Sequence, residues 1–134
     1  MDQALDTVER WYVVSTHARG EEMARNHLGR QGFTAFLPQY LKRRRHARRT
    51  DWVPSPLFPR YLFVAMDVGA TRWRAISSTF GVNHLICHGD MPTPVPTGII
   101  EDIQLRLGGD GLVEMTPEIP FKAGDVVRVT AGAM

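Results

Sequence analysis

The chain has 134 residues, 43% of them hydrophobic and 22% charged, and Lys and Arg exceed Asp and Glu by 16 to 14. This composition is typical of one globular domain, or of one domain with a piece of a second, and excludes a disordered chain. No apolar run approaches the roughly 18 residues that cross a membrane, the N-terminus is too polar for a signal peptide, and the single cysteine allows no internal disulfide. We therefore expect a cytoplasmic protein.

The first half of the chain predicts a strand, a helix and a second strand. Residues 11–16 are aromatic and β-branched, as in a strand. Residues 20–31 carry apolar side chains at helical spacing, and Gly32 follows as a helix-capping glycine. Residues 33–41 read as a strand. The window 42–49 is rich in Lys and Arg and precedes a proline-rich turn, which predicts a long hairpin whose basic tip reaches into solvent.

The second half of the chain repeats this order. A strand is predicted at 57–66, a helix at 71–79 whose inward stripe extends to Phe80, a strand at 82–87 and, after a proline-rich connector, a helix at 97–107. The resulting β-α-β-β-α-β order with an extra C-terminal helix predicts an α+β fold, a ferredoxin-like sandwich. Two helices would cover one face of its antiparallel sheet.

The pattern divides the chain into a domain and the start of another. Residues 1–108 form the predicted domain, and residues 109–120 read as a linker. Residues 121–134 are strand-like again, but the sequence stops before a second strand could pair with them. We interpret this last segment as the incomplete start of a small β-domain or as a short accessory strand.

The predicted strand 57–66 is more hydrophobic than a sheet covered on one face requires. Side chains alternate between the two faces of a strand, so Tyr61 and Phe63 share one face and Leu62 and Val64 share the other. Both faces of the strand are therefore apolar. The last helix or the linker could cover the second face. Otherwise the aromatic residues form an exposed surface that binds a protein partner.

Stacking of RNA bases is another use of aromatic side chains on a central strand. RNA-recognition domains share this element order, and residues 60–64 partly follow their third-strand motif. The glycine of that motif is missing, because Tyr61 follows Arg60 directly. An RNA-binding module that stacks bases on Tyr61 and Phe63, with Tyr12 as a further stacking residue, is the alternative function. A structural interaction domain is a third.

Three possible metal ligands, His84, Cys87 and His88, lie close together in the sequence. Strand alternation sends His84 and Cys87 to opposite faces, and no second pair of ligands is spaced to complete a structural zinc site. No residue is placed to orient a histidine or cysteine for nucleophilic catalysis. We therefore expect no metal, no cofactor and no catalytic residue, so that the protein is not an enzyme.

The sequence resembles the NusG family of transcription elongation factors over nearly its whole length. The segments 11–14, 58–64 and 81–82 (Trp-Tyr-Val-Val, Phe-Pro-Arg-Tyr-Leu-Phe-Val and Gly-Val) resemble the family's N-terminal domain. Residues 121–129 resemble the start of its C-terminal KOW domain. The segment 58–64 is most similar to the specialised RfaH-type members, because housekeeping NusG proteins have a glycine where Arg60 stands.

The resemblance implies a transcription elongation and antitermination factor. It would bind bacterial RNA polymerase through an aromatic hollow that grips the clamp helices of the largest subunit. The start of the second helix would touch the gate loop of the second-largest subunit, and bridging the clamp would suppress pausing or termination. With an incomplete KOW domain, the hollow would stay open. The matching polymerase-binding positions are Phe58, Tyr61, Phe63, Ser15, Arg72, Trp73 and Arg74.

The resemblance also implies contact with non-template or upstream DNA. Phe80 stands where RfaH-type members have an arginine, which implies a different DNA element or a weaker contact. Ribosomal protein or the termination factor Rho would bind only through a complete KOW domain, and no membrane contact is implied. The DNA-binding positions, including the basic tip, are His17, Arg19, His27, Arg30, Ser77, Thr79, Lys42, Arg43, Arg44 and Arg45.

Overall fold

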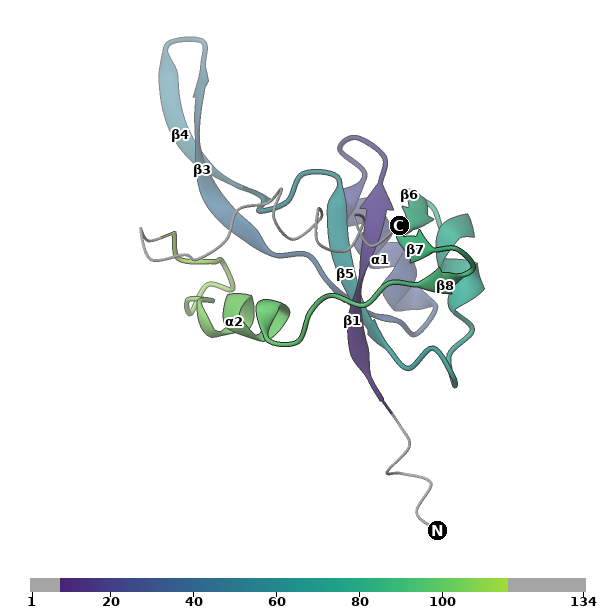
Figure 1. Ribbon diagram of the computed structural model, residues 1–134. Helices are drawn as coiled ribbons and strands as arrows, with labels where there is room; N and C mark the ends of the chain where they lie inside the picture. Colours follow the sequence, from purple (N-terminus) through teal and green to yellow (C-terminus); the bar gives the residue numbers. More distant parts are fainter. Residues whose placement is uncertain (1–7, 116–134) are drawn as a thin grey trace.

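A computed structural model describes residues 8–115 of the chain (Figure 1). No helix in this range is long and apolar enough to cross a membrane. The elements are β1 (Arg10–Thr16), α1 (Glu21–Arg30), β2 (Thr34–Phe36), β3 (Gln39–His46), β4 (Arg49–Pro56), β5 (Tyr61–Met66), the 3-10 helix η2 (Trp73–Ser78), β6 (Val82–Leu85), β7 (Cys87–His88), β8 (Met91–Pro92) and α2 (Ile99–Leu105).

Four strands form one antiparallel sheet in the order β2-β5-β1-β6. The central strands β1 and β5 pair along their whole length, with Arg10 opposite Met66 at one end and Ser15 opposite Tyr61 at the other. Their aromatic and β-branched residues fit a pleated surface that is buried on both sides. The order and pairing confirm the predicted α+β, ferredoxin-like fold.

Helix α1 packs on the first face of the sheet through a narrow aliphatic stripe. Ala24 and Leu28 are fully buried, whereas Met23, which the sequence places in the same stripe, is 51% exposed. The predicted capping residue, Gly32, has φ +93°, and the N–H of the next residue donates to the Leu28 carbonyl. This is the Schellman pattern, which satisfies carbonyls at the end of the helix. The sequence thus correctly predicts the helix and its end.

The sheet is covered on both faces. Two helices cover its first face, as predicted, and the last helix covers the second, which is one of the alternatives that the sequence leaves open. On the first face, α1 and η2 bury Val14, Leu62 and their neighbours. On the second face, Val13 and Phe63 pack in a cluster with Ile100 of α2. Figure 1 shows α1 and α2 on opposite sides of β1 and β5. The C-terminal helix therefore supplies the cover that the two apolar faces of β5 require.

The first part of the predicted linker packs against the second face. Val113 is 4% exposed, and its N–H donates to the Gln39 carbonyl over 2.7 Å. The Glu114 N–H donates to the Arg106 carbonyl just after α2. The packed region thus extends past the predicted boundary. The rest of the predicted linker and the KOW-like segment lie outside the described residues.

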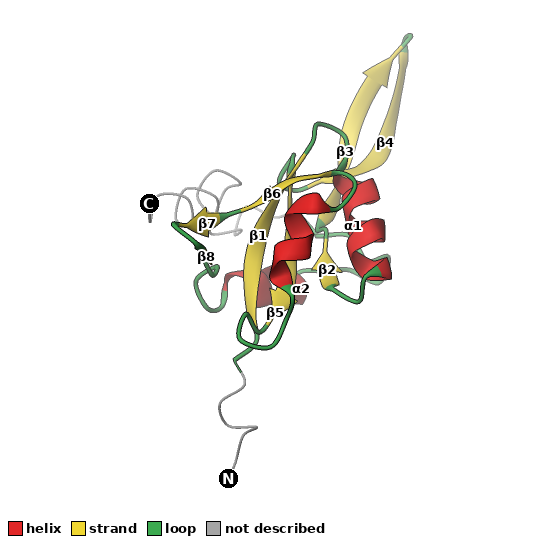
Figure 2. Cartoon of the chain, turned by 90° about the vertical axis from the view of Figure 1, so that its right-hand side faces the viewer, coloured by secondary structure: helices red, strands yellow, loops and turns green. Residues whose placement is uncertain are grey.

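A long two-stranded ribbon, the arm (residues 39–56), projects from the domain, and its outer part stands clear of the other described elements (Figures 1 and 2). The single strand predicted at 33–41 is broken into β2 and β3 at Pro38, which has no N–H to donate. β2 pairs with β5, whereas β3 pairs with β4. The basic window is therefore mostly strand, and its turn is formed by Ala47 and Arg48 with φ +50° and +69°.

The second half of the chain differs from the prediction in three places. The helix predicted at 71–79 is the shorter 3-10 helix η2, and Phe80 is 73% exposed because the helix ends before it. The strand predicted at 82–87 is cut short as β6 and followed by the small β7–β8 hairpin. The proline-rich connector then returns along the central strand, where the Val95 N–H donates to the Trp11 carbonyl.

Candidate functional site

Apart from Arg30, the predicted site residues fall into four separate places in the structure. The aromatic residues lie on the second face of the sheet, and a groove lies between the β1–α1 and η2–β6 loops. The positions predicted to touch the gate loop lie at the start of η2, and the basic window forms the arm. The groove brings together residues from two loops that are far apart in the sequence.

Two of the three aromatic residues predicted to bind polymerase lie in the core. Phe58 is 1% exposed and Phe63 is fully buried, and their rings meet edge to face at 5.4 Å. They share a cluster with α2 and Val113. The expectation of an open aromatic hollow is therefore wrong for these two residues, and so is base stacking on Phe63. Tyr12, the other predicted stacking residue, is 4% exposed on the opposite face.

Tyr61 is the predicted aromatic residue that remains partly open. It lies opposite Ser15 on β1, and Ser15 in turn lies opposite His84 on β6. The Asn83 amide reaches Ser15 Oγ at 3.5 Å. The sequence suggests His84 only as a metal ligand, because the register that brings it beside Ser15 is a property of the folded sheet. Tyr61, Ser15 and His84 form a row across three strands, which we call the Tyr61 row.

The turn that leads into Tyr61 is held by hydrogen bonds from two directions. Arg60 has φ +73°, a left-handed conformation that residues other than glycine avoid. Its N–H donates to the Glu21 carboxylate over 2.9 Å, and its carbonyl accepts from the Thr16 N–H over 2.8 Å. Glu21 is 8% exposed, so α1 uses a buried carboxylate to fix this turn. A glycine at this position would adopt the same conformation without strain.

Arg60→Gly is expected to raise the free energy of unfolding by about 1 kcal/mol. Glycine relieves the left-handed strain, although its greater freedom in the unfolded chain offsets part of the gain. Urea denaturation followed by circular dichroism measures the change. Arg60→Ala is the control, because it removes the same side chain but keeps the strain. Equal stabilities of the two variants would contradict a role of the backbone conformation.

An open groove of about 610 Å³ lies between the β1–α1 loop and the η2–β6 loop. The loops are joined by a hydrogen bond from the His17 N–H to the Gly81 carbonyl over 3.0 Å. Gly81 has φ +87°, and a Cβ there would lie 2.7 Å from the Ala24 nitrogen, so only glycine allows this approach. The predicted DNA-binding residues that line the groove are His17, Arg19, Ser77 and Thr79.

The hydroxyl groups of the groove already serve the fold. Thr79 is 7% exposed, and its Oγ1 donates to the Ala75 carbonyl and accepts from the Gln31 amide. Ser77 Oγ accepts from the Leu85 N–H. The Thr79 proton is therefore used internally, and this residue shapes the wall of the groove.

Side chains that the sequence assigns to the core form the open part of the groove. Phe80 and Met23 both line it and are 73% and 51% exposed. The His27 ring lies 5.4 Å from the Phe80 ring in a tilted arrangement. With the exposed Arg19, the groove combines an aromatic surface with positive charge, which is typical of sites for unpaired nucleic acid. Arg30 is exposed in the last turn of α1, outside the groove lining.

The start of η2 presents a cationic surface. Arg72 and Arg74 are exposed, whereas Trp73 is partly buried against the first core. The Arg74 guanidinium lies 4.3 Å from the centre of the Trp73 ring, a cation–π contact. Trp73 therefore acts as a platform for Arg74.

The basic window forms the exposed part of the arm. Every residue from Leu41 to Trp52 is exposed. Arg44 donates two hydrogen bonds of 3.2 and 2.9 Å to Asp51 on the neighbouring strand, which raise the Arg44 pKa. Within residues 8–115, no other cation of the arm has a carboxylate within 4 Å. The arm is thus a positively charged two-stranded ribbon whose backbones are held together by antiparallel pairing.

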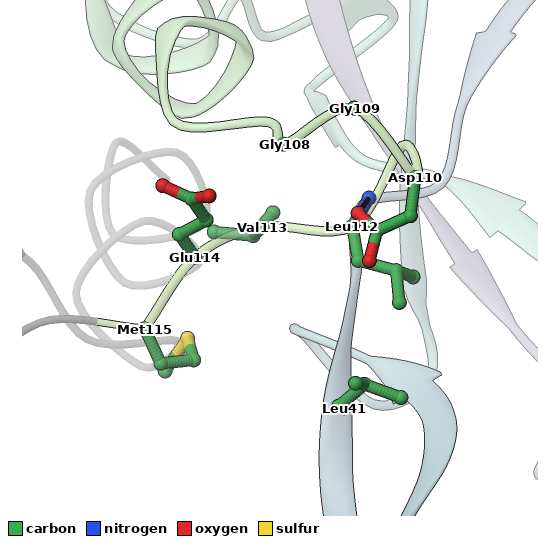
Figure 3. Close-up of a pocket in the computed structure, with 8 residues that line it drawn as sticks. All are labelled: Leu41, Gly108, Gly109, Asp110, Leu112, Val113, Glu114 and Met115. Carbon is green, nitrogen blue, oxygen red and sulfur yellow. Dashed lines mark hydrogen bonds between the residues drawn. The ribbon is translucent and has the colours of Figure 1, made fainter.

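A smaller pocket of about 390 Å³ lies where the arm meets the segment after α2 (Figure 3). Leu41 lines it from β3, and residues 108–115 supply the rest of the lining. The Asp110 carboxylate accepts the Leu112 N–H over 3.0 Å, so this acid shapes its own loop. None of the predicted site residues lines this pocket.

The candidate metal ligands do not come together. Among residues 8–115, no group of three His, Cys, Asp or Glu side chains could hold a metal ion. Cys87 is partly buried, and burial, with a smaller effect of Asp90, raises the pKa of its thiol. A thiol that stays protonated at neutral pH is a weak nucleophile.

Comparisons with known proteins identify relatives of the chain. A family model described as "Transcription termination factor nusG" matches residues 9–104. The transcription termination/antitermination protein NusG of Thermus thermophilus is 29% identical in an alignment 138 residues long. The alignment covers 91% of this chain and 75% of that protein. The NusG proteins of Deinococcus radiodurans and Helicobacter pylori are 33% and 30% identical over 60% and 63% of this chain. The chain spans about half of their length, 48% and 47%.

A solved structure gives the same result for the fold. It is described as "Domain interaction in Thermotoga maritima NusG" and aligns over 88% of this chain and 70% of that chain, with a TM-score of 0.50 and 26% identity. The family match at 9–104 includes the sheet, the groove and the arm. Because this match extends over most of the sequence, the chain belongs to the NusG family of transcription termination and antitermination factors.

Proposed function

We propose that this chain is the polymerase-binding part of a specialised, RfaH-type antitermination factor, and that it docks on the clamp helices of the largest polymerase subunit through the Tyr61 row. The observation that carries the proposal is Tyr61, a partly exposed ring on a central strand within the RfaH-type motif. Membership of a family of transcription factors, which are not enzymes, supports a binding role.

Tyr61 is suited to bind the apolar tip of a helical hairpin. Its ring packs against the cluster that contains Phe58 and Phe63, so little side-chain freedom is lost on docking. The buried aromatic residues support Tyr61 from beneath and need not touch the partner. A well-packed aromatic residue at an interface contributes on the order of 2 kcal/mol. Ser15, where RfaH-type members have a tyrosine, makes this contact smaller.

Arg72 and Arg74 are proposed to contact the gate loop of the second-largest subunit. Trp73, which lies beneath Arg74, packs against the first core, whereas Tyr61 packs against the second. Contacts on two sides of one domain would engage both sides of the clamp only when it is closed. Such differential binding favours the elongating state and suppresses pausing or termination.

The groove is proposed to hold the exposed non-template DNA strand. Phe80 would stack on a base, Arg19 would bind phosphate, and His17, His27 and Arg30 would add donors or charge nearby. The arm cations Lys42, Arg43, Arg44 and Arg45 are proposed to contact the backbone of nucleic acid. Ribosomal protein and Rho would be partners of a complete KOW domain, to which 121–134 is proposed to belong.

Tyr61→Ala is expected to weaken binding to purified bacterial RNA polymerase about 30-fold, the equivalent of about 2 kcal/mol. Surface plasmon resonance with immobilised core polymerase measures the affinity. Trp52→Ala is the matched control, because it removes an exposed aromatic ring from the arm. Circular dichroism and thermal melting check that both variants fold. Unchanged polymerase binding by a folded Tyr61→Ala, or an equal loss in Trp52→Ala, would contradict the proposed surface.

A further inference from the structure

The arm has two unlike faces, because residues directly opposite each other in a ribbon point to the same side. Each face is defined by the register of β3 and β4. The tryptophan face consists of Leu41, Arg43, Arg45, Thr50, Trp52 and Pro54. The carboxylate face consists of Lys42, Arg44, His46, Arg49, Asp51 and Val53.

The two faces differ in charge pairing and in apolar exposure. On the carboxylate face, Arg44 is paired with Asp51 over 2.9 Å. The tryptophan face has no carboxylate, so its two arginines have no acidic partner on that face. Trp52, directly opposite Arg43, is 61% exposed, and Leu41 is 45% exposed. The tryptophan face therefore combines unpaired guanidinium groups with a large apolar surface.

The exposed side chains of the arm contribute nothing to the core. No residue between Leu41 and Trp52 is buried. The turn places Ala47 and Arg48 in left-handed conformations, where Asn-Gly would be free of strain. A strained arginine at the tip and an uncovered indole on the shaft both indicate that the arm is shaped for a partner.

We propose that the tryptophan face binds an unpaired nucleic-acid strand. One base stacks on the Trp52 indole, and Arg43 and Arg45 hold the phosphates beside it. Any unpaired base offers a flat surface to an indole, and alternate residues of a strand lie roughly 6.8 Å apart, so two guanidinium groups can follow one backbone. A duplex hides the faces of its bases, and an acidic protein surface would use the cations of both faces without needing Trp52.

The inference rests on the nucleic-acid role proposed for the arm, but not on polymerase docking. Its test is fluorescence anisotropy with the full chain and three labelled 12-nucleotide probes: unpaired oligo-U, unpaired oligo-dT and a DNA duplex of the same length. Trp52→Ala is expected to weaken binding of the unpaired probes about tenfold, and Trp52→Phe to restore most of the affinity, because stacking needs an aromatic ring.

A pair of double variants tests the face. Arg43→Ala/Arg45→Ala is expected to weaken binding about tenfold or more and to reduce the salt dependence by about 1.4 in the log–log slope. Lys42→Ala/Arg49→Ala removes two positive charges from the carboxylate face. Lys42 is proposed to contact the backbone through its charge alone, so we expect a loss at least about threefold smaller than that of Arg43→Ala/Arg45→Ala. All the substituted residues are exposed, and circular dichroism confirms that the variants fold.

Several results would overturn the proposal. Equal losses in the two double variants would mean attraction by charge without a defined face. Unchanged affinity in Trp52→Ala, tighter binding of the duplex, or no binding of either unpaired probe would exclude stacking on the arm. A preference for oligo-U or for oligo-dT supports the proposal and identifies the strand as RNA or DNA. Polymerase binding by Tyr61→Ala is measured separately, so the two proposals can fail independently.

Discussion

Phe63→Ala is expected to lower the free energy of unfolding by about 3–5 kcal/mol. Phe63 is fully buried, and its ring packs edge to face against Phe58 in the cluster that includes Ile100. Truncation leaves a cavity between the sheet and α2, which are both too rigid to fill it. Urea denaturation followed by circular dichroism measures the loss. Since domains are stable by about 5–15 kcal/mol, this loss is a large fraction of the total free energy of unfolding.

Two controls separate the core role of Phe63 from a role in binding. Phe63→Leu keeps most of the volume and is expected to lose about 1 kcal/mol. Phe80→Ala removes a ring that is 73% exposed and is expected to change stability by less than about 0.5 kcal/mol. If Phe63→Leu binds polymerase normally while Tyr61→Ala does not, the interface lies at Tyr61. A loss below about 1 kcal/mol in Phe63→Ala would be inconsistent with its buried position.

Gly81→Ala is expected to lower the free energy of unfolding by about 3 kcal/mol or more. The left-handed conformation at Gly81 alone costs alanine about 1–2 kcal/mol. In addition, the new Cβ would lie 2.7 Å from the Ala24 nitrogen and 2.9 Å from the Gly20 carbonyl oxygen. Both neighbours are backbone atoms, so α1 or the loop must move. Urea denaturation measures the loss, and amide chemical shifts of the groove residues report the displacement.

Gly32→Ala is the matched control for this prediction. Gly32 has φ +93°, close to the +87° of Gly81, but no described atom beyond its two chain neighbours lies within 4 Å of the position of its Cβ. It is therefore expected to lose only the conformational part, about 1–2 kcal/mol. The difference between the two variants measures the close approach of the loops. If both glycines gave the same loss, the tight contact at the groove would be disproved.

The sequence predicts the fold well where the signal lies within one short segment of the chain. The helix stripe through Ala24 and Leu28 and the capping glycine after it correctly place α1. Hydrophobic residues on both faces of β5 are compatible with internal cover and with an exposed aromatic surface, and the structure shows internal cover for Phe58 and Phe63. The pattern does not identify the element that covers the second face, because the sequence of an amphipathic helix such as α2 does not specify the surface against which its apolar side packs. Packing of Val113 against that face was likewise hidden in a segment without clear periodicity.

The site was harder to predict, because exposure depends on tertiary neighbours. Tyr61 and Phe63 share a face of β5, yet only Phe63 is fully buried. Phe80 fits a helical stripe in the sequence, but η2 ends before it and leaves the ring in the groove. The arm was predicted as a hairpin, whereas its two faces follow from the register of β3 and β4. The residue types predict which chemical groups the protein has, and the fold determines which of these groups are accessible to a partner.

The backbone hydrogen bonds that fasten the segment after α2 have a mechanical consequence. The Val113 N–H is bonded to Gln39 at the root of the arm, and the Glu114 N–H is bonded to Arg106. Tension applied through the chain beyond residue 115 would therefore load the root of the arm and the end of α2 first. The central strands, with Tyr61, would be shielded until these two bonds give way. A pull from a downstream partner would thus reorient the arm before it disturbed the Tyr61 row.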